Sequence, residues 1–203
     1  MADNWAVFVE GLDGLSDVEK ATPSVRLAAV RAINKITRDG RVELARLILR
    51  EVNFPASYVS PSGKRLYVSK QATRNDLEGR ITARSRATSL ARFVTGTPSG
   101  QGVRVQVSPG KSRYMKRAFL IKLPAGTASV DTKYNMGLAI RLRPGEQLKN
   151  KRTARRMANG LYMLYGPSVD QVFRAEDGDG VANDAAPDLA AKLEREFLRL
   201  LEI

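Results

Sequence analysis

The first residues that suggest chemistry are the alternating carboxylates of residues 176–180, Glu-Asp-Gly-Asp-Gly. Alternating acidic oxygens with a nearby glycine are typical of a calcium-binding loop. An EF-hand loop begins with an oxygen ligand and ends, at its twelfth position, with a bidentate glutamate, where this chain has Ala175 and Ala186. We therefore favour an acidic linker here over a metal site.

Asp76 and Glu78 are the next candidates, because paired carboxylates can hold the metal ions of a nuclease. They stand among arginines without a third carboxylate, which favours a charge-paired surface. The chain has no histidine and no cysteine, which excludes imidazole or thiolate metal sites, cysteine nucleophiles and catalytic triads that use histidine. Residues 96–100 lack the lysine of a phosphate-binding loop. We expect no catalytic residue, no cofactor and no enzyme activity.

The strongest electrostatic feature is the basic run of residues 149–156. Such a run neutralises phosphates without reading base sequence, because it offers charge but no fixed geometry toward base edges. With only 6% aromatic residues to stack on single-stranded bases, duplex or packaged DNA is the preferred nucleic acid. A solvated loop or a contact with an acidic ring partner remains the alternative. The residues expected to face DNA or that partner are Lys149, Lys151, Arg152, Arg155 and Arg156.

The positive charge is concentrated in the middle of the 203-residue chain, whose formal net charge is +13. Residues 1–60 carry 8 basic and 8 acidic side chains, residues 61–160 carry 22 and 4, and residues 161–203 carry 4 and 9, giving 0, +18 and −5. A basic middle beside an acidic tail suits subunits that pair opposite charges, and a solvated surface is the alternative. We expect neither a signal peptide nor a membrane span, because no long apolar run is present.

Several periodic segments must position these residues. Thr22-Pro23 and helical apolar spacing predict one long amphipathic helix over residues 24–52, with a kink or a close helix contact at Gly40. Residues 103–107 and 118–123 are expected to pair as a hairpin. The helix is expected to cover one antiparallel sheet, giving an α+β fold. The segments expected to be strands are 5–9, 65–68, 77–83, 103–107, 118–123, 139–143 and 161–165.

The carboxyl-terminal part predicts a short helix over residues 168–173 and a final helix opened by Pro187. The apolar stripe on that final helix consists of Leu189, Leu193, Phe197, Leu200 and Leu201. Leu193, Phe197 and Leu200 are expected to dock on the core or on a neighbouring subunit. We therefore expect one α+β domain over residues 1–174, followed by an acidic linker and a docking helix over residues 175–203.

Six short segments between residues 25 and 174 follow a familiar order: 30–36, 72–81, 89–93, 102–107, 117–121 and 164–169. The most specific is the last, which consists of Leu164, Tyr165, Gly166, Pro167, Ser168 and Val169. Taken in order, the set resembles the phage minor tail protein Z family, the tail completion proteins of tailed bacteriophages. Residues 125–135 and 149–160 depart from the pattern, and residues beyond 175 lie outside it.

This resemblance implies a structural virion protein, a tail completion or head–tail connector component without enzyme activity. It implies a homo-oligomeric ring of six or twelve copies around the DNA channel, at the neck or tail of a particle assembled in the host cytoplasm. The implied partners are other neck, portal or adaptor and tail proteins, and packaged DNA bound through its phosphates. The alternative is a free, non-specific DNA- or RNA-binding protein.

Overall fold

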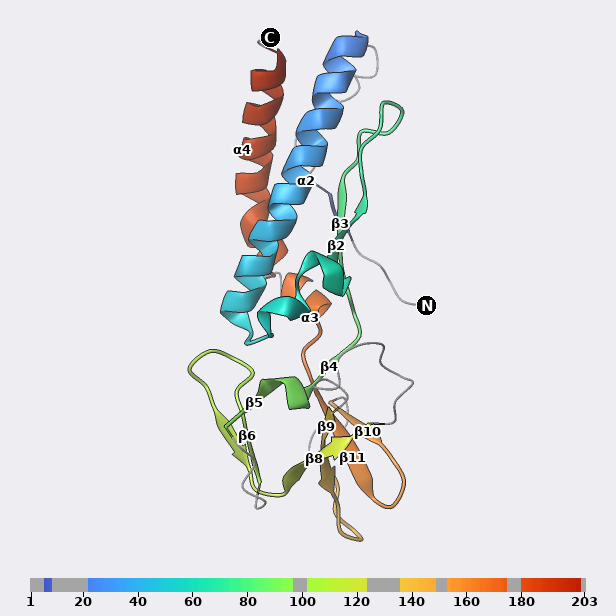
Figure 1. The fold of residues 1–203 in the computed structure, drawn as a ribbon, viewed down its shortest axis with the longest axis vertical. Coiled ribbons are helices and arrows are strands. Elements are labelled where there is room, and N and C mark those ends of the chain that lie inside the picture. The colour runs from blue at the N-terminus through green and yellow to red at the C-terminus, as the bar shows by residue number, and fades with distance from the viewer. Residues whose placement is uncertain are drawn as a thin grey trace. The chain divides into compact units, whose positions relative to one another are not determined.

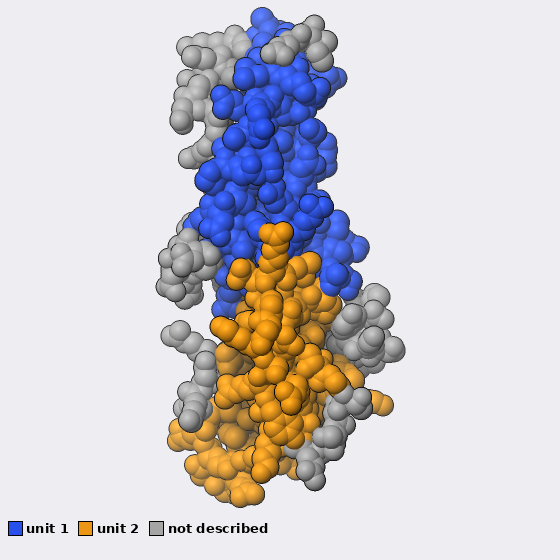
Figure 2. Space-filling model, turned by 90° about the vertical axis from the view of Figure 1, so that its left-hand side faces the viewer, with its two compact units in different colours: residues 1–48, 56–85, 169–203 blue, residues 49–55, 86–168 orange. Residues whose placement is uncertain are grey.

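The computed structural model describes residues 6–8, 22–96, 102–123, 136–148, 153–174 and 180–201. The chain divides into two compact units, which Figure 2 shows in different colours. Unit 1 comprises residues 1–48, 56–85 and 169–203, and unit 2 comprises residues 49–55 and 86–168. This division differs from the boundary expected at residue 174, because the carboxyl-terminal helix belongs to the same unit as the long amino-terminal helix.

Unit 1 is built on two helices that run in opposite directions, α2 (Pro23–Glu51) and α4 (Val181–Leu201), shown in Figure 1. Gly40 is buried on α2, and a Cβ atom there would lie only 3.0 Å from Leu189 Cδ2. Of the two roles expected for this glycine, the structure has the close helix contact. The missing side chain lets α4 approach the backbone of α2.

The start of α4 differs from the prediction, since Pro187 lies inside the helix and Val181 begins it. The Gly180 carbonyl accepts hydrogen bonds from the Asn183 and Asp184 N–H groups, which starts the first turn before the proline. Pro187 is the seventh residue of α4, beyond the first four N–H groups that have no helical acceptor, so the helix lacks the backbone hydrogen bond that another residue there would donate to the carbonyl of residue 183. Pro187 therefore does not mark the first residue of α4.

Two ion pairs join α2 to α4. Lys35 Nζ lies 2.9 Å from Glu196 Oε2, and Lys192 Nζ lies 2.8 Å from Glu43 Oε2. Glu196 also accepts hydrogen bonds from Arg199, and the Arg199 guanidinium together with the Lys35 ammonium lowers the pKa of Glu196 to about 2. The helix pair is thus held by apolar contact at its centre and by paired charges beside it.

A small antiparallel sheet completes unit 1, and the short helix α3 (Val169–Arg174) packs near it. Its strands, in spatial order, are β1 (Ala6–Phe8), β3 (Arg80–Ala83) and β2 (Leu66–Lys70). Two short 3₁₀ helices, η1 (Ala56–Tyr58) and η2 (Pro61–Gly63), precede β2. The strand expected over residues 77–83 is observed only over residues 80–83, as β3.

Arg41 fastens this sheet to α2. Its side chain is buried, with Nε donating to the Leu66 carbonyl at 3.0 Å and Nη2 donating to the Val59 carbonyl. Burial lowers the pKa of Arg41. Because a buried cation requires acceptors, the two carbonyls hold the start of β2 and the preceding loop at a fixed place along α2.

Unit 2 contains two further antiparallel sheets. The larger has the strand order β10-β11-β9-β8, with β4 paired to β11, and the smaller has the order β5-β6-β7. A 3₁₀ helix, η3 (Leu90–Phe93), lies between β4 and β5 in the chain. The strands are β4 (Thr88–Ser89), β5 (Val94–Thr95), β6 (Val103–Val105), β7 (Arg113–Met115), β8 (Ala118–Lys122), β9 (Met136–Arg141), β10 (Ala154–Arg156) and β11 (Leu161–Gly166).

The predicted α+β fold class is confirmed, but the predicted hairpin and the predicted single sheet are wrong. Residues 103–107 and 118–123 do not form a hairpin, because β6 pairs with β7 and β8 pairs with β9. A second turn, at Lys116-Arg117, follows β7 directly and directs β8 into the other sheet. The strands that the structure describes also form three sheets instead of one, and α2 belongs to the unit that holds the β1-β3-β2 sheet.

Gly79, just before β3, has no room for a side chain. A Cβ atom there would overlap Thr37 Oγ1 and lie 3.0 Å from Ile33 Cγ2 on α2. We expect Gly79→Ala to lower the free energy of unfolding by about 1–3 kcal/mol, the usual cost of overpacking. Urea unfolding of this variant, alone and combined with Thr37→Ala, measures the effect. The loss should shrink in the double variant, and an equal loss in both backgrounds would contradict the assignment.

Glu196 makes the stability of unit 1 dependent on pH. Its folded-state pKa of about 2 lies below the ordinary value of 4.5, so its stabilising effect is present above pH 4.5 and is lost as the pH falls toward 2. Glu196→Gln should lower the melting temperature at pH 6, and the difference from wild type should vanish near pH 2. A difference that stays constant across this range would show that the ion pairs do not matter.

Candidate nucleic-acid interface

The net positive charge of the protein lies in unit 2. Unit 2 contains 17 of the 34 Lys and Arg residues but only 3 of the 21 Asp and Glu residues, a net charge of +14. Unit 1 contains 17 basic and 18 acidic residues, a net charge of −1. The sequence division already concentrated a net charge of +18 in residues 61–160, and the structure places a net charge of +14 in one compact unit, which makes unit 2 the candidate site.

Arg155 and Arg156 are the two residues of the predicted basic cluster that the structure describes. Both are exposed on β10, where Arg155 pairs with Met163 and Arg156 pairs with Tyr162 of β11. Successive side chains of a strand point to opposite faces, so these two arginines lie on opposite faces of the sheet. One flat ligand surface therefore contacts only one of them. Lys149, Lys151 and Arg152 lie outside the described residues.

The register brings Arg141 to the same face as Arg155. Arg141 of β9 pairs with Leu161 of β11, and Leu161 shares a face with Met163, the partner of Arg155. The two arginines thus flank β11, one on each neighbouring strand, and both are exposed. Within the described ranges, neither has a carboxylate within ion-pair distance. The sequence placed Arg141 beside the basic run, but only the strand pairing puts it on this face.

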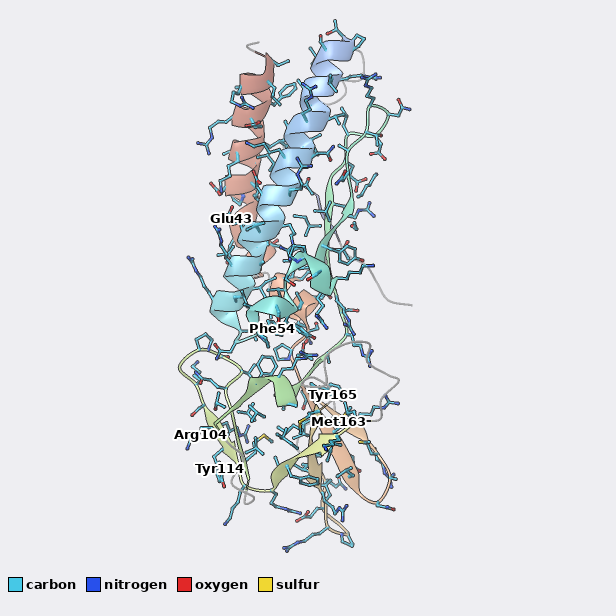
Figure 3. All side chains as sticks on the ribbon, viewed as in Figure 1. Glu43, Phe54, Arg104, Tyr114, Met163 and Tyr165 are labelled. Carbon is cyan, nitrogen blue, oxygen red and sulfur yellow. The ribbon has the colours of Figure 1, made fainter. Side chains whose placement is uncertain are left out.

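The same face of the sheet carries apolar side chains. Phe119 of β8 is opposite Ala139 of β9 and remains 39% exposed. Met163, labelled in Figure 3, covers Gly137, where a Cβ atom would meet its Sδ atom at 2.8 Å. The face therefore combines two free guanidinium groups with an apolar centre. We call it the Arg141–Arg155 face.

Glu146 neutralises part of the charge at the end of β9. Its carboxylate accepts hydrogen bonds from Arg117 Nη1 at 2.8 Å and from the Arg143 N–H at 2.7 Å. The Arg117 guanidinium, followed by the Arg143 N–H, lowers the pKa of Glu146 to about 2. Arg117 also donates to the Arg141 carbonyl at 2.8 Å, so this ion pair fixes the turn that follows the Arg141–Arg155 face.

The six motif residues, 164–169, join the last strand of unit 2 to the first turn of α3 in unit 1. Leu164, Ser168 and Val169 are buried. Tyr165 pairs with Ser89 of β4, and Pro167 follows the end of the strand. At Gly166 a Cβ atom would lie 3.1 Å from Phe93 Cε2, so glycine allows a close approach there. The motif residues therefore lie in the pairing with β4 and in the connection from β11 to α3.

The three predicted docking residues lie on α4 at different depths. Leu193 is buried within unit 1, whereas Phe197 and Leu200 are half-buried. Further buried residues of α4 lie earlier in the helix, at Val181, Ala182 and Ala185. The prediction missed those residues because it started the helix at Pro187.

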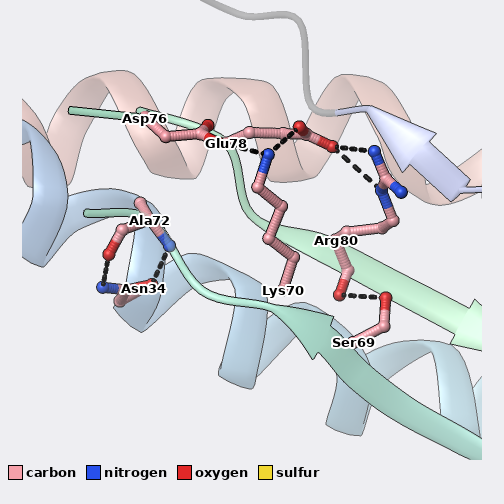
Figure 4. A network of polar contacts seen from close by, with 7 residues as sticks. All are labelled: Asn34, Ser69, Lys70, Ala72, Asp76, Glu78 and Arg80. Carbon is pink, nitrogen blue, oxygen red and sulfur yellow. Dashed lines mark hydrogen bonds and ion pairs between the residues drawn. The ribbon is translucent and has the colours of Figure 1, made fainter.

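Asp76 and Glu78 take part in a network of ion pairs, shown in Figure 4. Lys70 Nζ contacts both carboxylates, at 2.6 Å from Asp76 Oδ2, and Arg80 donates to Glu78 Oε1. Hydrogen bonds to Asp76 and then to Glu78 raise the pKa of Lys70, and the Lys70 bond lowers the pKa of Glu78. Beside this network, Asn34 of α2 donates a hydrogen bond to the Ala72 carbonyl and accepts one from the Ala72 N–H. This network closes the β2–β3 hairpin.

Within the described parts of the chain, no three His, Cys, Asp or Glu side chains gather where they could hold a metal ion. None of the described helices has the length and the apolar composition that crossing a membrane requires. Comparison with protein-family models, with curated proteins and with solved structures finds no match. The family resemblance of the ordered segments therefore stays a prediction from the sequence.

We expect the Arg141–Arg155 face to contact DNA phosphates. The variant Arg141→Gln with Arg155→Gln should reduce the slope of log K against log salt by about 2, since each lost phosphate contact removes about 0.9. Fluorescence anisotropy with duplex DNA at several salt concentrations measures this slope. Arg31→Gln with Arg38→Gln on α2 has the same charge change and should leave the slope almost unchanged. Equal slopes for both pairs would exclude a specific role for this face.

Proposed function

We propose that this protein is a structural component of a tailed-phage particle, a tail completion or head–tail connector subunit that acts without catalysis. Copies form a ring around the DNA channel at the neck or tail and join tail to head. The ordered segments between residues 25 and 174 support the family, and the charge of unit 2 supports contact with packaged DNA.

The observation that carries the proposal is the concentration of charge in unit 2. A ring around DNA requires a lining that tolerates or attracts phosphate, and a unit with a net charge of +14 meets that requirement. Unit 1, with a net charge of −1, can take part in contacts with neighbouring proteins without strong repulsion. Other neck, portal or adaptor and tail proteins are the proposed partners above and below the ring.

A second function, free binding of DNA or RNA without sequence preference, is favoured by the same charge. The two functions differ in where the protein is found and in its mass. A ring seen by light scattering and negative-stain imaging, or a tag confined to the neck of purified particles, supports the virion role. A monomer that never enters particles and binds DNA with a steep salt dependence supports the second function.

Neutralising the predicted basic cluster tests the contact with DNA. We expect the five changes Lys149→Gln, Lys151→Gln, Arg152→Gln, Arg155→Gln and Arg156→Gln to reduce particle yield or DNA retention, because the cluster loses five positive charges that attract phosphate. Circular dichroism should show that the protein still folds. The measurement is the titre and DNA content of particles assembled with the variant.

The matched control removes five exposed charges from unit 1: Arg31→Gln, Arg38→Gln, Arg46→Gln, Lys64→Gln and Arg74→Gln. Particle yield and DNA content should stay near wild type for this control. Wild-type yield and DNA content from the unit 2 variant would rule out a role for the cluster.

A further inference from the structure

Unit 2 contains an apolar pocket between its two sheets. The pocket has a volume of about 460 Å³, within the range of ligand and side-chain binding pockets. Ile140 and Leu164 of the larger sheet form one wall, and Val105 and Met115 of the β6–β7 hairpin form another. Met115 and Ile140 are only half-buried, so the pocket retains apolar surface that the described residues do not cover.

Among the described residues, two cations line this pocket. Arg113 pairs with Val105 across the hairpin, which puts both side chains on the face toward the pocket, and Lys111 precedes it on the same turn. Both are exposed, and neither has a carboxylate partner among the residues that the structure describes. An occupant that combines apolar side chains with a carboxylate therefore complements the pocket in both shape and charge.

Helix α4 has an exposed stripe with this composition. Leu198 and Leu201 are 50% and 41% exposed, although the opposite side of the helix is buried through Leu189 and Leu193. Glu194 is exposed one turn before Leu198, so Glu194, Leu198 and Leu201 stand at i, i+4 and i+7 on one face. An amphipathic helix that docks in a groove uses anchors at this spacing.

We infer that the pocket of unit 2 receives the Glu194, Leu198 and Leu201 stripe of α4 from a second copy of this chain. Residues 169–203 carry 9 acidic and 4 basic side chains, whereas unit 2 carries a net charge of +14, so the two surfaces attract. Two copies of unit 2 repel each other, which opposes a symmetric contact through the pocket.

The contact is head-to-tail, because each copy offers a pocket and a helix stripe that are different surfaces. Such contacts generate a closed ring when the rotation between neighbours closes. The inference rests on the proposed ring and identifies the contact that builds it.

The chain has no cysteine, so a cross-linking test has no background from native thiols. One protein carries Met115→Cys and the other, made longer by a tag, carries Leu198→Cys. Mixed in equal amounts and oxidised mildly, they should yield a disulfide-linked heterodimer, separated by size from either homodimer. Tyr114→Cys in place of Met115→Cys is the matched control. Tyr114 is adjacent and 50% exposed, but it pairs with Arg104 on the other face of the hairpin (Figure 3).

A charge exchange tests the same contact without cysteines. Arg113→Glu should reduce the oligomer to a monomer of 22.3 kDa, and adding Glu194→Lys to the same chain should restore the oligomer. Arg104→Glu, with the same charge change on the other face, should leave the oligomer intact. Light scattering gives the mass in each case.

The outcomes separate the inference from the proposed function. If the protein forms a ring but the Met115→Cys and Leu198→Cys proteins give no disulfide-linked heterodimer, the inferred contact is wrong while the proposed ring stands. The same holds if Arg113→Glu leaves the ring intact. Binding of decanoate to the pocket of an intact ring also overturns the inference, since the pocket is then open to a small ligand. A wild-type monomer that never enters particles overturns both.

Discussion

Electrostatic repulsion within unit 2 is the constraint on which the other features depend. Seventeen cationic side chains and three carboxylates share about 90 residues, and Glu146 can neutralise only the turn beside Arg117. Net charge of one sign destabilises a compact unit by self-repulsion. A polyanion or an acidic neighbour relieves that repulsion, so binding of either kind also stabilises the folded unit.

Unit 1, whose net charge is close to zero, contains ion pairs between its elements. Its two helices approach at Gly40, and the Lys35–Glu196 and Lys192–Glu43 pairs lie beside that contact. The Lys70 network closes the β2–β3 hairpin in the same way. Unit 1 thus pairs charges across its helix contact and its hairpin, whereas Arg141 and Arg155 of unit 2 have no carboxylate within ion-pair distance among the residues that the structure describes.

The sequence predicted the local elements better than their partners. The long helix was expected over residues 24–52 and is observed over residues 23–51, because helical periodicity and Pro23 are local signals. The pairing of β6 with β7 was missed, because the turn at Pro109-Gly110 was expected to join residues 103–107 to 118–123. That turn joins β6 to β7, and a second turn at Lys116-Arg117 separates β7 from β8. The Arg141–Arg155 face depends on two pairings, β10 with β11 in a hairpin and β9 with β11 across residues 142–160. No strand was expected at residues 154–156, because their basic side chains lack the apolar alternation of a half-buried strand, so the face of Arg155 could not be assigned from the sequence.

The order of the chain has a consequence for synthesis of the protein. Unit 2 interrupts unit 1, so α2 emerges from the ribosome long before α4, which supplies Leu189 and Leu193 to the core. During that interval the buried face of α2, around Gly40, has no α4 to cover it. A chain that stops before α4 keeps that apolar face exposed and is a substrate for chaperones and proteases. Only chains that reach α4 complete the core of unit 1.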